Sequence, residues 1–500
     1  METPETLPHP SDGSILYDSD QSKIIDPIHQ TSLYPSDVPV LYDNNHLNKI
    51  DWKQFSKTYV HNQAIVYLDN KVAGHISMAD KIETIKQRFC QKGVPYDKIA
   101  TRQCANCDIN IPMFLIEGPG IDTVIVSEGV PGGTQPQPKT VGESYSLNFL
   151  SQIPKHTWET SKPNKGAAAS IDPNKETVTI AVLDTGLDYT LVNPAYVCDK
   201  FTPKANMPCF SDVEKGGWNF LNNGPDFTDD NNGRHGSLVS QYIINQFKDS
   251  PRGVKIMPLK THDANGGGDL FSITCAIHFA IAKGANIINA SWGFYYYYDD
   301  NFLPYFKNLI GNELQQKGIL FVTAAGNKIE SDDKLAERIW QNQGHASLTR
   351  TDLRDVGIHK FFPAHLSAET NNIVTVTTTD VDIHDVSDQQ NHSDIYVDLG
   401  IKADVDKNAK GEDDPSFEVP FELIPGAPTA YVAGSSFATA IATGHIGANN
   451  DTAKYKPGLR KGDFINPIPI PTPGLSPLIE HLNVRNLIRN GTCVEDYVKP

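Results

Sequence analysis

Short apolar runs alternate with amphipathic stretches from about residue 177 onward. Runs of four to eight apolar residues are typical of buried strands, and stretches with a helical period are typical of helices. The predicted strands lie at 177–183, 254–259, 286–290, 319–323 and 372–377, and the predicted helices at 236–247 and 270–283. This alternation predicts an α/β fold, a mostly parallel sheet with helices on both faces. Functional groups in such sheets gather beyond the carboxyl ends of the strands.

The pattern before residue 130 differs and predicts a small α+β domain over 49–129. Its predicted strands are 64–68, 113–116 and 123–127. A helix begins after Ser77, with Asp80 three residues later as a capping-box partner. Residues 1–48 are polar without a sustained period, so we expect an extended or mobile arm there.

A linker and a long second domain complete the predicted organisation. Residues 130–144 are dense in Pro, Gly and Gln, which is typical of a linker. The second domain spans 145–500, with polar insertions at about 328–362 and 402–425. The first insertion fits a solvated excursion better than a lid over a binding pocket. The second is acidic and fits a solvated loop.

Charge narrows the possible partners. The 500 residues carry 43 Lys and Arg against 60 Asp and Glu, a formal net charge of −17. This sign disfavours nucleic acid and anionic membranes as partners. Apolar runs stay below the roughly 18 residues that a membrane helix needs, so no membrane insertion is expected. The N-terminal segment lacks the features of a secretory signal and predicts a cytoplasmic protein, unless the sequence begins after a removed signal.

The seven cysteines are too few for a disulfide scaffold. Cys104 and Cys107 have the spacing of half a zinc site or of a redox pair, but a second pair with ligand spacing is missing nearby. Two reduced structural thiols are therefore the favoured interpretation. Cys198 and Cys209 could pair in an oxidising compartment, which the sequence leaves open.

Four short motifs carry candidate chemistry. Asp184 ends the first predicted strand of the α/β region, and His235 opens the next helix. Asn327 follows a buried strand, and Ser436 begins a helix within Gly-Ser-Ser-Phe-Ala. Each motif alone is common in turns and loops. However, a helix N-terminus favours developing negative charge, and an asparagine amide can donate a hydrogen bond to an oxyanion.

Taken in chain order, Asp184, His235, Asn327 and Ser436 resemble the signature of the subtilisin-like serine peptidases, the subtilases. The resemblance covers about residues 145–500 and implies a subtilisin-like α/β fold. It also implies the roles. Ser436 would be the nucleophile and His235 the general base and acid. Asp184 would orient the imidazole, and Asn327 would donate to the oxyanion.

The resemblance also implies where a protein or peptide substrate binds. Two further stretches, 253–260 with the glycines that follow and 286–293, resemble the edge segment and the pocket wall that hold an extended peptide. The implied substrate-binding residues are Gly266, Gly267, Gly268, Ser291, Trp292, Gly293, Ala325 and Gly326. The aromatic run Phe294–Tyr298 fits a core or edge strand and an aromatic substrate rim equally well.

Some positions depart from the family pattern. Phe437, Thr439 and Ala440 stand where the family usually has Met, Ser and Pro. Residues 245–253 are too short for the loop that builds a calcium site in many relatives, so no metal is expected there. No cofactor is expected to be required, although acidic clusters leave calcium possible elsewhere.

The implied activity is that of a serine endopeptidase, made as a zymogen and kept latent by the N-terminal domain at 49–129 acting as an intramolecular inhibitor. A permanent accessory domain is the alternative for that unit. A dedicated maturation peptidase for one partner or precursor, and a catalytically silent binding protein, are the alternatives for the chain. The presence of all four residues disfavours a catalytically silent binding protein, because a protein that no longer catalyses a reaction need not keep them.

Overall fold

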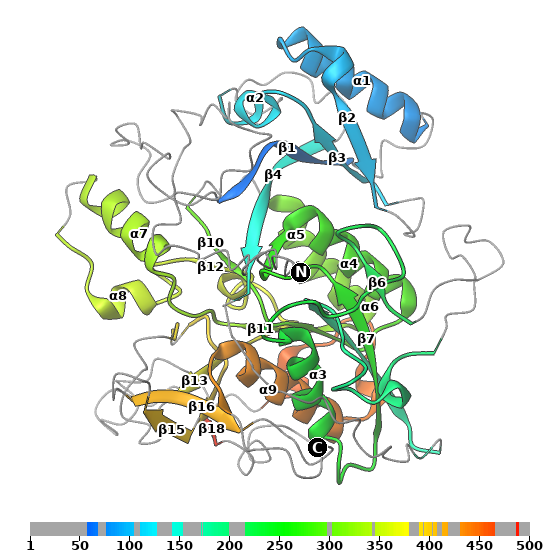
Figure 1. Cartoon of the computed structure of the whole chain (residues 1–500), viewed down its shortest axis with the longest axis vertical. Helices are drawn as coiled ribbons and strands as arrows, with labels where there is room; N and C mark the ends of the chain where they lie inside the picture. The colour runs from blue at the N-terminus through cyan, green and yellow to red at the C-terminus, as the bar shows by residue number, and fades with distance from the viewer. Residues whose placement is uncertain are drawn as a thin grey trace, which may run out of the picture.

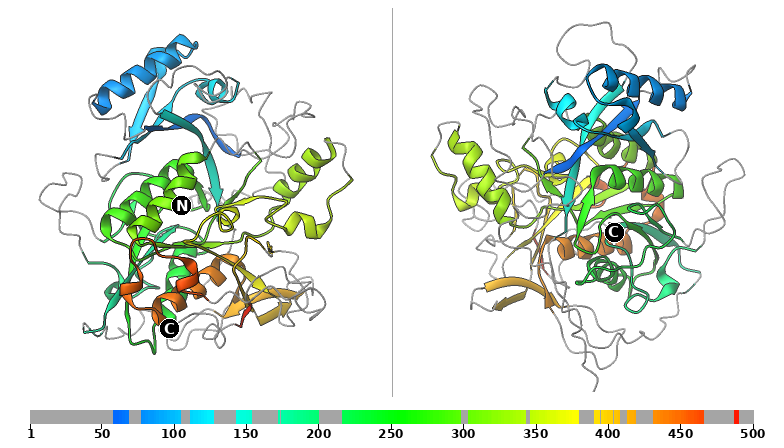
Figure 2. Two further views of the ribbon diagram at one scale, coloured as in Figure 1. Left: turned by 180° about the vertical axis from the view of Figure 1, so that it is seen from behind. Right: turned by 45° about the horizontal axis from the view of Figure 1, so that its top comes forward.

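The computed structural model describes residues 58–68, 77–104, 111–127, 143–153, 172, 174–199, 216–297, 303–342, 346–379, 390–393, 395–402, 404–407, 413–418, 431–465 and 487–489. They form a large α/β domain and, above it in Figures 1 and 2, a smaller N-terminal unit. The predicted arm at 1–48 and the predicted linker up to residue 142 lie outside the described residues. Within the described residues, every helix is too short or too polar to cross a membrane.

A parallel sheet forms the centre of the large domain. Its strand order is β18-β14-β13-β11-β9-β5-β7-β6, and neighbouring strands pair in parallel throughout. The strands are β5 (Thr177–Asp184), β6 (Trp218–Asn219), β7 (Gly253–Lys260), β9 (Ile287–Ala290), β11 (Leu320–Ala324), β13 (Ile373–Thr379), β14 (Leu399–Lys402) and β18 (Leu487–Arg489). The α/β fold class and the five predicted strands of this region are confirmed.

Helices cover both faces of this sheet (Figures 1 and 2). Outside the first insertion, the α-helices in the described part of the large domain are α3 (His235–Asn245), α4 (Leu270–Lys283), α5 (Pro304–Asn308), α6 (Leu314–Lys317) and α9 (Ser435–Asn449). α3 and α9 share one buried apolar cluster with alternate residues of β5, including Ile180. α4 shares the other cluster with the intervening residues, including Ala181. The two-residue period of the strand therefore divides the core into two layers.

The N-terminal unit is an antiparallel sheet covered by two helices. Its strand order is β2-β3-β1-β4, continued by β8 of the large domain. The elements are β1 (Tyr59–Leu68), α1 (Met78–Gln91), β2 (Ala100–Gln103), β3 (Met113–Glu117), α2 (Ile121–Ser127), β4 (Glu143–Gln152) and β8 (Gly267–Asp269). The expected cap is present, since Ser77 Oγ accepts the Asp80 N–H at 3.1 Å.

The strand predicted at 123–127 is wrong, because these residues belong to helix α2. The run is rich in β-branched residues, which favour strands. Ile121 and Ile125 nevertheless lie four residues apart and are both buried. That spacing places both side chains on one face of a helix, and packing against β1 outweighs the local strand preference.

Strand β4 joins the two units. It pairs with β1, where Leu147 lies opposite Ala64, and then with β8, where Ser151 lies opposite Gly268. Figure 1 shows it descending from the N-terminal sheet into the large domain. The division into domains remains a prediction. Its boundary needs correction, however, because 143–152 completes the N-terminal sheet, whereas the sequence assigned residues from 145 onward to the second domain.

A disulfide also joins the two units. Cys104, after β2, is bonded to Cys275 in α4. The interpretation of Cys104 as a reduced thiol is therefore wrong, because its partner lies 171 residues away and not in the Cys-x-x-Cys pair. Cys107 lies outside the described residues. Cys198 has a free thiol, and its possible partner Cys209 is also outside them.

The first insertion packs against the domain and is not a solvated excursion. It contains α7 (Glu330–Asn342), α8 (Arg350–Arg354) and β12 (Phe361–Phe362), and β12 pairs with β10 (Phe294–Tyr295). α7 is polar overall, but Leu335, Ala336 and Ile339 are spaced along one helical face and are buried.

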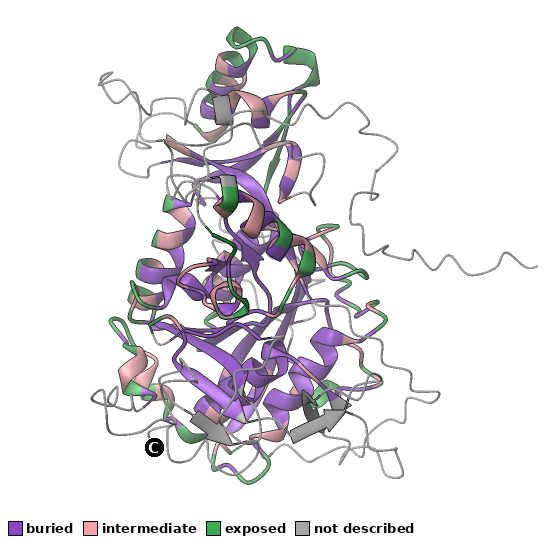
Figure 3. Cartoon of the chain, turned by 90° about the vertical axis from the view of Figure 1, so that its left-hand side faces the viewer, coloured by how far each residue is buried: buried purple, intermediate pink, exposed green. Residues whose placement is uncertain are grey.

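Figure 3 shows buried residues continuing across both units.

The second insertion carries strands where the sequence suggested a loop. Its strands are β15 (Asp404–Lys407) and β16 (Asp413–Glu418), which form a three-stranded sheet with β17 (Tyr431–Val432). Both pairings are antiparallel.

Candidate active site

Asp184 and His235 form a buried hydrogen-bonded pair at the carboxyl edge of the parallel sheet. Asp184 is the last residue of β5, and His235 is the first residue of α3. His235 Nδ1 lies 2.9 Å from Asp184 Oδ1 and 3.1 Å from Oδ2. Both residues are almost fully buried. His235 Nε2 is buried without a hydrogen-bond partner in the described part of the chain.

Backbone packing fixes this pair. Gly236 lies so close to β5 that a Cβ there would lie 3.1 Å from Asp184 Cβ, and its N–H donates to Thr185 Oγ1 at 2.9 Å. The Asp184 carbonyl accepts the N–H of Thr261 at 2.9 Å. Asp184 is therefore held by the start of α3, which packs against its side chain, and by the residue after β7, which binds its backbone carbonyl.

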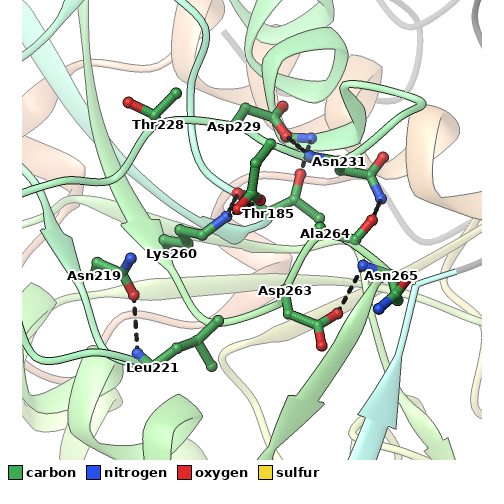
Figure 4. Close-up of polar contacts among 12 residues, drawn as sticks. Thr185, Asn219, Leu221, Thr228, Asp229, Asn231, Lys260, Asp263, Ala264 and Asn265 are labelled. Carbon is green, nitrogen blue, oxygen red and sulfur yellow. Dashed lines mark hydrogen bonds and ion pairs between the residues drawn. The ribbon is translucent and has the colours of Figure 1, made fainter. Parts of the chain in front are cut away.

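Neighbouring loops are tied together by side chains (Figure 4). Lys260 Nζ donates to the Thr185 carbonyl at 2.5 Å and forms an ion pair with Asp230 at 2.6 Å. Asn231 Nδ2 donates to the carbonyl of Ala264 at 2.9 Å. These contacts connect the loop before α3 to the ends of β5 and β7, so they position the loop that carries His235.

Ser436 lies in the first turn of α9. Its hydroxyl donates to the Ser291 carbonyl at 3.0 Å, and Ser291 Oγ donates back to the Ser436 carbonyl at 2.8 Å. Asn289 Nδ2 donates to Ser291 Oγ at 2.9 Å, which completes a buried network beneath the helix. In this rotamer the Ser436 hydroxyl points to Ser291 and not to the free nitrogen of His235. Such hydrogen bonds are often unformed before substrate binds.

Asn327 is held beside the same helix end. Its Oδ1 accepts the backbone N–H of Ser435 at 3.0 Å and the Ser435 hydroxyl at 2.9 Å. An N–H group must face an acceptor, so this contact assigns the amide orientation and leaves Nδ2 as a donor. A Cβ at Gly434 would lie 3.2 Å from Asn327 Nδ2, and Gly434 has φ +123°. Glycine meets both the space and the backbone requirement there.

The end of β4 lies between β8 and the segment at Gly293, and we call the space that it occupies the groove. The N–H of Gln152 donates to the Gly293 carbonyl at 3.2 Å, and that of Ile153 donates to the Gly266 carbonyl at 2.8 Å. Ser151 Oγ lies 3.0 Å from Nε2 of His262. The chain therefore enters the groove as an added strand between the two segments that the sequence analysis assigned to substrate.

His262 lines this groove as a neutral side chain. It is completely buried, and burial lowers the pKa of its imidazole to about 3, with Lys260 and His235 acting in the same direction and Asp184 opposing. Nδ1 lies 2.9 Å from Thr261 Oγ1. Burial likewise raises the pKa of the neighbouring Asp229 carboxyl, while hydrogen bonds from Ser237 oppose that shift.

The structure brings most of the sequence-assigned residues together. Gly267 and Gly268 lie in β8 beside β4, and Gly266 and Gly293 accept its N–H groups. Trp292 is 1% exposed, which places its side chain in the core. Ala325 and Gly326 follow β11 directly before Asn327. Residues 294–297 of the aromatic run are buried, so they form core and not a substrate rim; Tyr298 lies outside the described residues.

Sequence reasoning missed the residues that fill the groove. Gln152 and Ile153 were assigned to the second domain without a role, and His262 and Phe361 were not singled out. The segment 150–153 gives no chemical signal, because it binds through backbone N–H groups. His262 directly follows a predicted strand, which is the position that indicates functional residues in a parallel sheet.

The fold and site define a class: an α/β protein whose parallel sheet holds an Asp–His pair beside a serine in the first turn of a helix. The model of the subtilase family, Peptidase_S8, matches residues 175–453. This match covers more than half of the 500 residues, and the chain belongs to the subtilase family.

Two curated relatives match shorter stretches. Subtilisin-like protease 1 of Plasmodium berghei (strain Anka) is 30% identical over 240 residues, which are 44% of this chain and 36% of the relative. The Thermophilic serine proteinase of Bacillus sp. (strain AK1) is 28% identical over 194 residues, 38% of this chain and 40% of the relative. The matches thus span about two fifths of the length of these relatives.

The solved structures that match are more distant in sequence. The Epidermin leader peptide processing serine protease (EpiP) from Staphylococcus aureus has a TM-score of 0.46 and 14% identity, covering 87% of this chain and 97% of that chain. Fervidolysin from Fervidobacterium pennivorans has a TM-score of 0.47 and 14% identity, covering 88% and 61%.

Proposed function

We propose that this chain is a serine endopeptidase with Ser436 as its nucleophile. The observation that carries the proposal is the buried Asp184–His235 pair, which leaves His235 Nε2 free at the edge of the sheet where α9 presents Ser436. A buried imidazole nitrogen without a partner is costly unless another group uses it. Membership of the subtilase family supports this assignment.

Proton transfer follows from the hydrogen bonds. A rotation about the Ser436 Cα–Cβ bond exchanges the contact with the Ser291 carbonyl for one with His235 Nε2. His235 then takes the hydroxyl proton as Oγ bonds to the substrate carbonyl carbon, and Asp184 stabilises the charged imidazole through Nδ1. His235 next gives the proton to the leaving amine, and water repeats the sequence to free the acid and restore Ser436.

The oxyanion is stabilised by two kinds of donor. The first N–H groups of α9 have no acceptor within the helix, and the helix dipole adds positive potential there. Asn327 supplies its Nδ2, because Ser435 occupies the amide oxygen. These donors are fixed before the reaction, so they need little reorganisation as negative charge develops.

The proposal includes latency. β4 fills the groove through the Gln152 and Ile153 N–H groups, and an extended peptide substrate would use the same acceptors on Gly293 and Gly266. The N-terminal unit would thus act as an intramolecular inhibitor until β4 leaves the groove. Competition for the same backbone acceptors is the physical basis of this inhibition.

Our proposals on the cofactor and on the cellular location start from the sequence. The reaction described above uses protein groups and water, and we propose no required cofactor. The described residues contain no group of three or more His, Cys, Asp or Glu arranged to hold a metal ion. A cytoplasmic location was expected, but the Cys104–Cys275 disulfide favours an oxidising compartment, because such bonds are rare in the cytosol.

Hydrolysis of denatured casein tests the proposed activity. The full chain would be given a protease site between residues 153 and 172, cut there and then reduced. We expect hydrolysis that falls on the order of 10⁴-fold or more in Ser436→Ala and His235→Ala. Ser347→Ala, an exposed serine in the first insertion, is the matched control and should retain full activity.

Two other outcomes point to the alternatives. Intact casein together with cleavage of a single partner or precursor would favour a dedicated maturation peptidase. Intact casein and an unreactive Ser436 in the cut, reduced chain would contradict the proposal and favour a silent binding protein.

A further inference from the structure

Two glycines lie on neighbouring segments beside Ser436, and we call the space between them the crevice. β9 and β11 are parallel neighbours, so the segments that follow them leave the sheet side by side. Gly293 lies on the first segment and Gly326 on the second, directly before Asn327. Ser436 Oγ contacts the carbonyl of Ser291 on the first segment at 3.0 Å. The crevice therefore opens between the nucleophile and the proposed oxyanion donor.

A substrate places a side chain over this crevice. A peptide that follows the path of β4 runs past Gly293, and Gly293 lies two residues after Ser291, whose carbonyl accepts the Ser436 hydroxyl. When the carbonyl carbon lies at Ser436 Oγ and its oxygen at Asn327, the same residue's side chain lies above the gap between the two segments. Because Gly293 and Gly326 have no side chains, the identity of the residue between them decides how much of this gap a substrate can use.

Phe361 fills the gap. A Cβ at Gly293 would collide with Cε1 and Cζ of the Phe361 ring. A Cβ at Gly326 would lie 2.7 Å from Cε1 and 2.8 Å from Cδ1 of the same ring. The ring is therefore in contact with both glycine walls, and it is only 4% exposed.

Several contacts hold this ring in place. Phe361 pairs with Tyr295 across β12 and β10, and their rings meet edge to face with centroids 5.0 Å apart. The Tyr295 hydroxyl donates to Asn391 Oδ1 at 2.9 Å and also lies 3.2 Å from the Asn327 carbonyl. A close-packed ring bounded by paired strands cannot leave without disrupting its neighbours.

We propose that Phe361 limits the residue before the cut to small side chains: glycine, alanine or serine. The inference rests on the proposed endopeptidase function and names the substrate class of that same site. Leucine, phenylalanine and lysine would have to occupy the volume of the Phe361 ring. Overpacking of this kind is strongly unfavourable, so such substrates should react slowly.

A peptide library tests the inference in the cut and reduced full chain. The mixture is a tryptic digest of denatured casein, and mass spectrometry identifies the residue before each new cut. We expect at least about 100-fold faster cleavage after Ala, Gly and Ser than after Leu or Phe. Comparable cleavage after Leu or Phe in the unmodified chain would overturn the inference while leaving the proposed function intact.

Variants of Phe361 give the second measurement. In Phe361→Ala and Phe361→Leu, we expect cleavage after Leu and Phe to rise at least tenfold, more in the alanine variant, while cleavage after Ala changes less. Tyr189→Ala, which removes a 42% exposed aromatic ring elsewhere, should keep the original preference. An unchanged preference in a folded Phe361→Ala protein would overturn the assignment. A chain that neither cleaves peptides nor reacts at Ser436 would overturn the proposed function itself.

Discussion

At the scale of single residues, the site depends on amide and imidazole groups whose orientation is set by a neighbour. Asn327 can donate because Ser435 binds its oxygen, and His235 can act as a base because Asp184 binds its other nitrogen. The placement of Asp184, His235, Asn327 and Ser436 at ends of strands and helices was predictable, because each ends, follows or begins a recognisable element, and their catalytic roles are our proposal. Phe361 was not, because its role depends on contact with two glycines distant in sequence.

Replacing Asn327 by Leu should remove an oxyanion donor. We expect kcat to fall about 10²- to 10³-fold with KM nearly unchanged, because the donor acts mainly in the transition state. The measurement is the steady-state hydrolysis of a peptide substrate that has Ala immediately before the cleaved bond. A drop confined to KM, in a variant with the thermal stability of the parent protein, would contradict the oxyanion role.

Buried His262 should make the protein sensitive to acid. Its imidazole has a pKa of about 3 in the folded chain against 6.5 for the free side chain, so the unfolded chain binds more protons between these values. The contribution of His262 to the free energy of unfolding is therefore fully present above pH 6.5. It falls as the pH drops, by about 1.4 kcal/mol per pH unit, until the pH reaches about 3.

The variant His262→Asn tests this contribution. The difference in unfolding free energy between pH 7.5 and pH 5, measured by urea denaturation, should be about 2 kcal/mol smaller in the variant. The comparison at pH 7.5 serves as the internal control for lost packing. Equal pH dependence in the two proteins would mean that His262 is not held neutral by burial.

At the scale of elements, β4 shows what local sequence can and cannot predict. The strands and helices of the central sheet were predictable from their periodicity, because each buries a regular face. The path of β4 was not, since its partners β1 and β8 lie in different units. Helix α7 was likewise taken for a solvated segment, because its short apolar face is surrounded by charged residues.

The hydrogen bond from Gln152 to Gly293 tests the inhibitory role of β4. Gln152→Pro removes the N–H donor, whereas Gln152→Ala changes only the side chain. We expect the uncut proline variant to hydrolyse casein at least about tenfold faster than the parent, because one strand hydrogen bond is lost and the backbone is strained. The alanine variant should stay latent. Equal latency in both variants would argue against inhibition through this strand.

At the scale of the whole molecule, two kinds of link hold the N-terminal unit to the catalytic domain. One apolar cluster continues from β1 and β3 of the unit into α4 of the domain. The disulfide between Cys104 and Cys275 adds a covalent link. Cleavage after β4 would therefore not by itself release the unit, and this permanent attachment could not be predicted from the spacing of Cys104 and Cys107.

A cut between residues 153 and 172 tests the covalent link. On a denaturing gel without reductant, the two fragments should migrate together, and reductant should separate them. Cys104→Ser should separate without reductant. Separation of the unmodified, alkylated fragments without reductant would show that the two cysteines are not bonded.

The most direct test of the central claim is the rate at which a fluorophosphonate labels Ser436, followed by intact-protein mass spectrometry. We expect slow labelling of the uncut chain, and fast single labelling after the chain is cut and reduced. Ser436→Ala should not be labelled, and His235→Ala should be labelled far more slowly. Failure of the cut and reduced protein to react would contradict the assignment of Ser436 as an activated nucleophile.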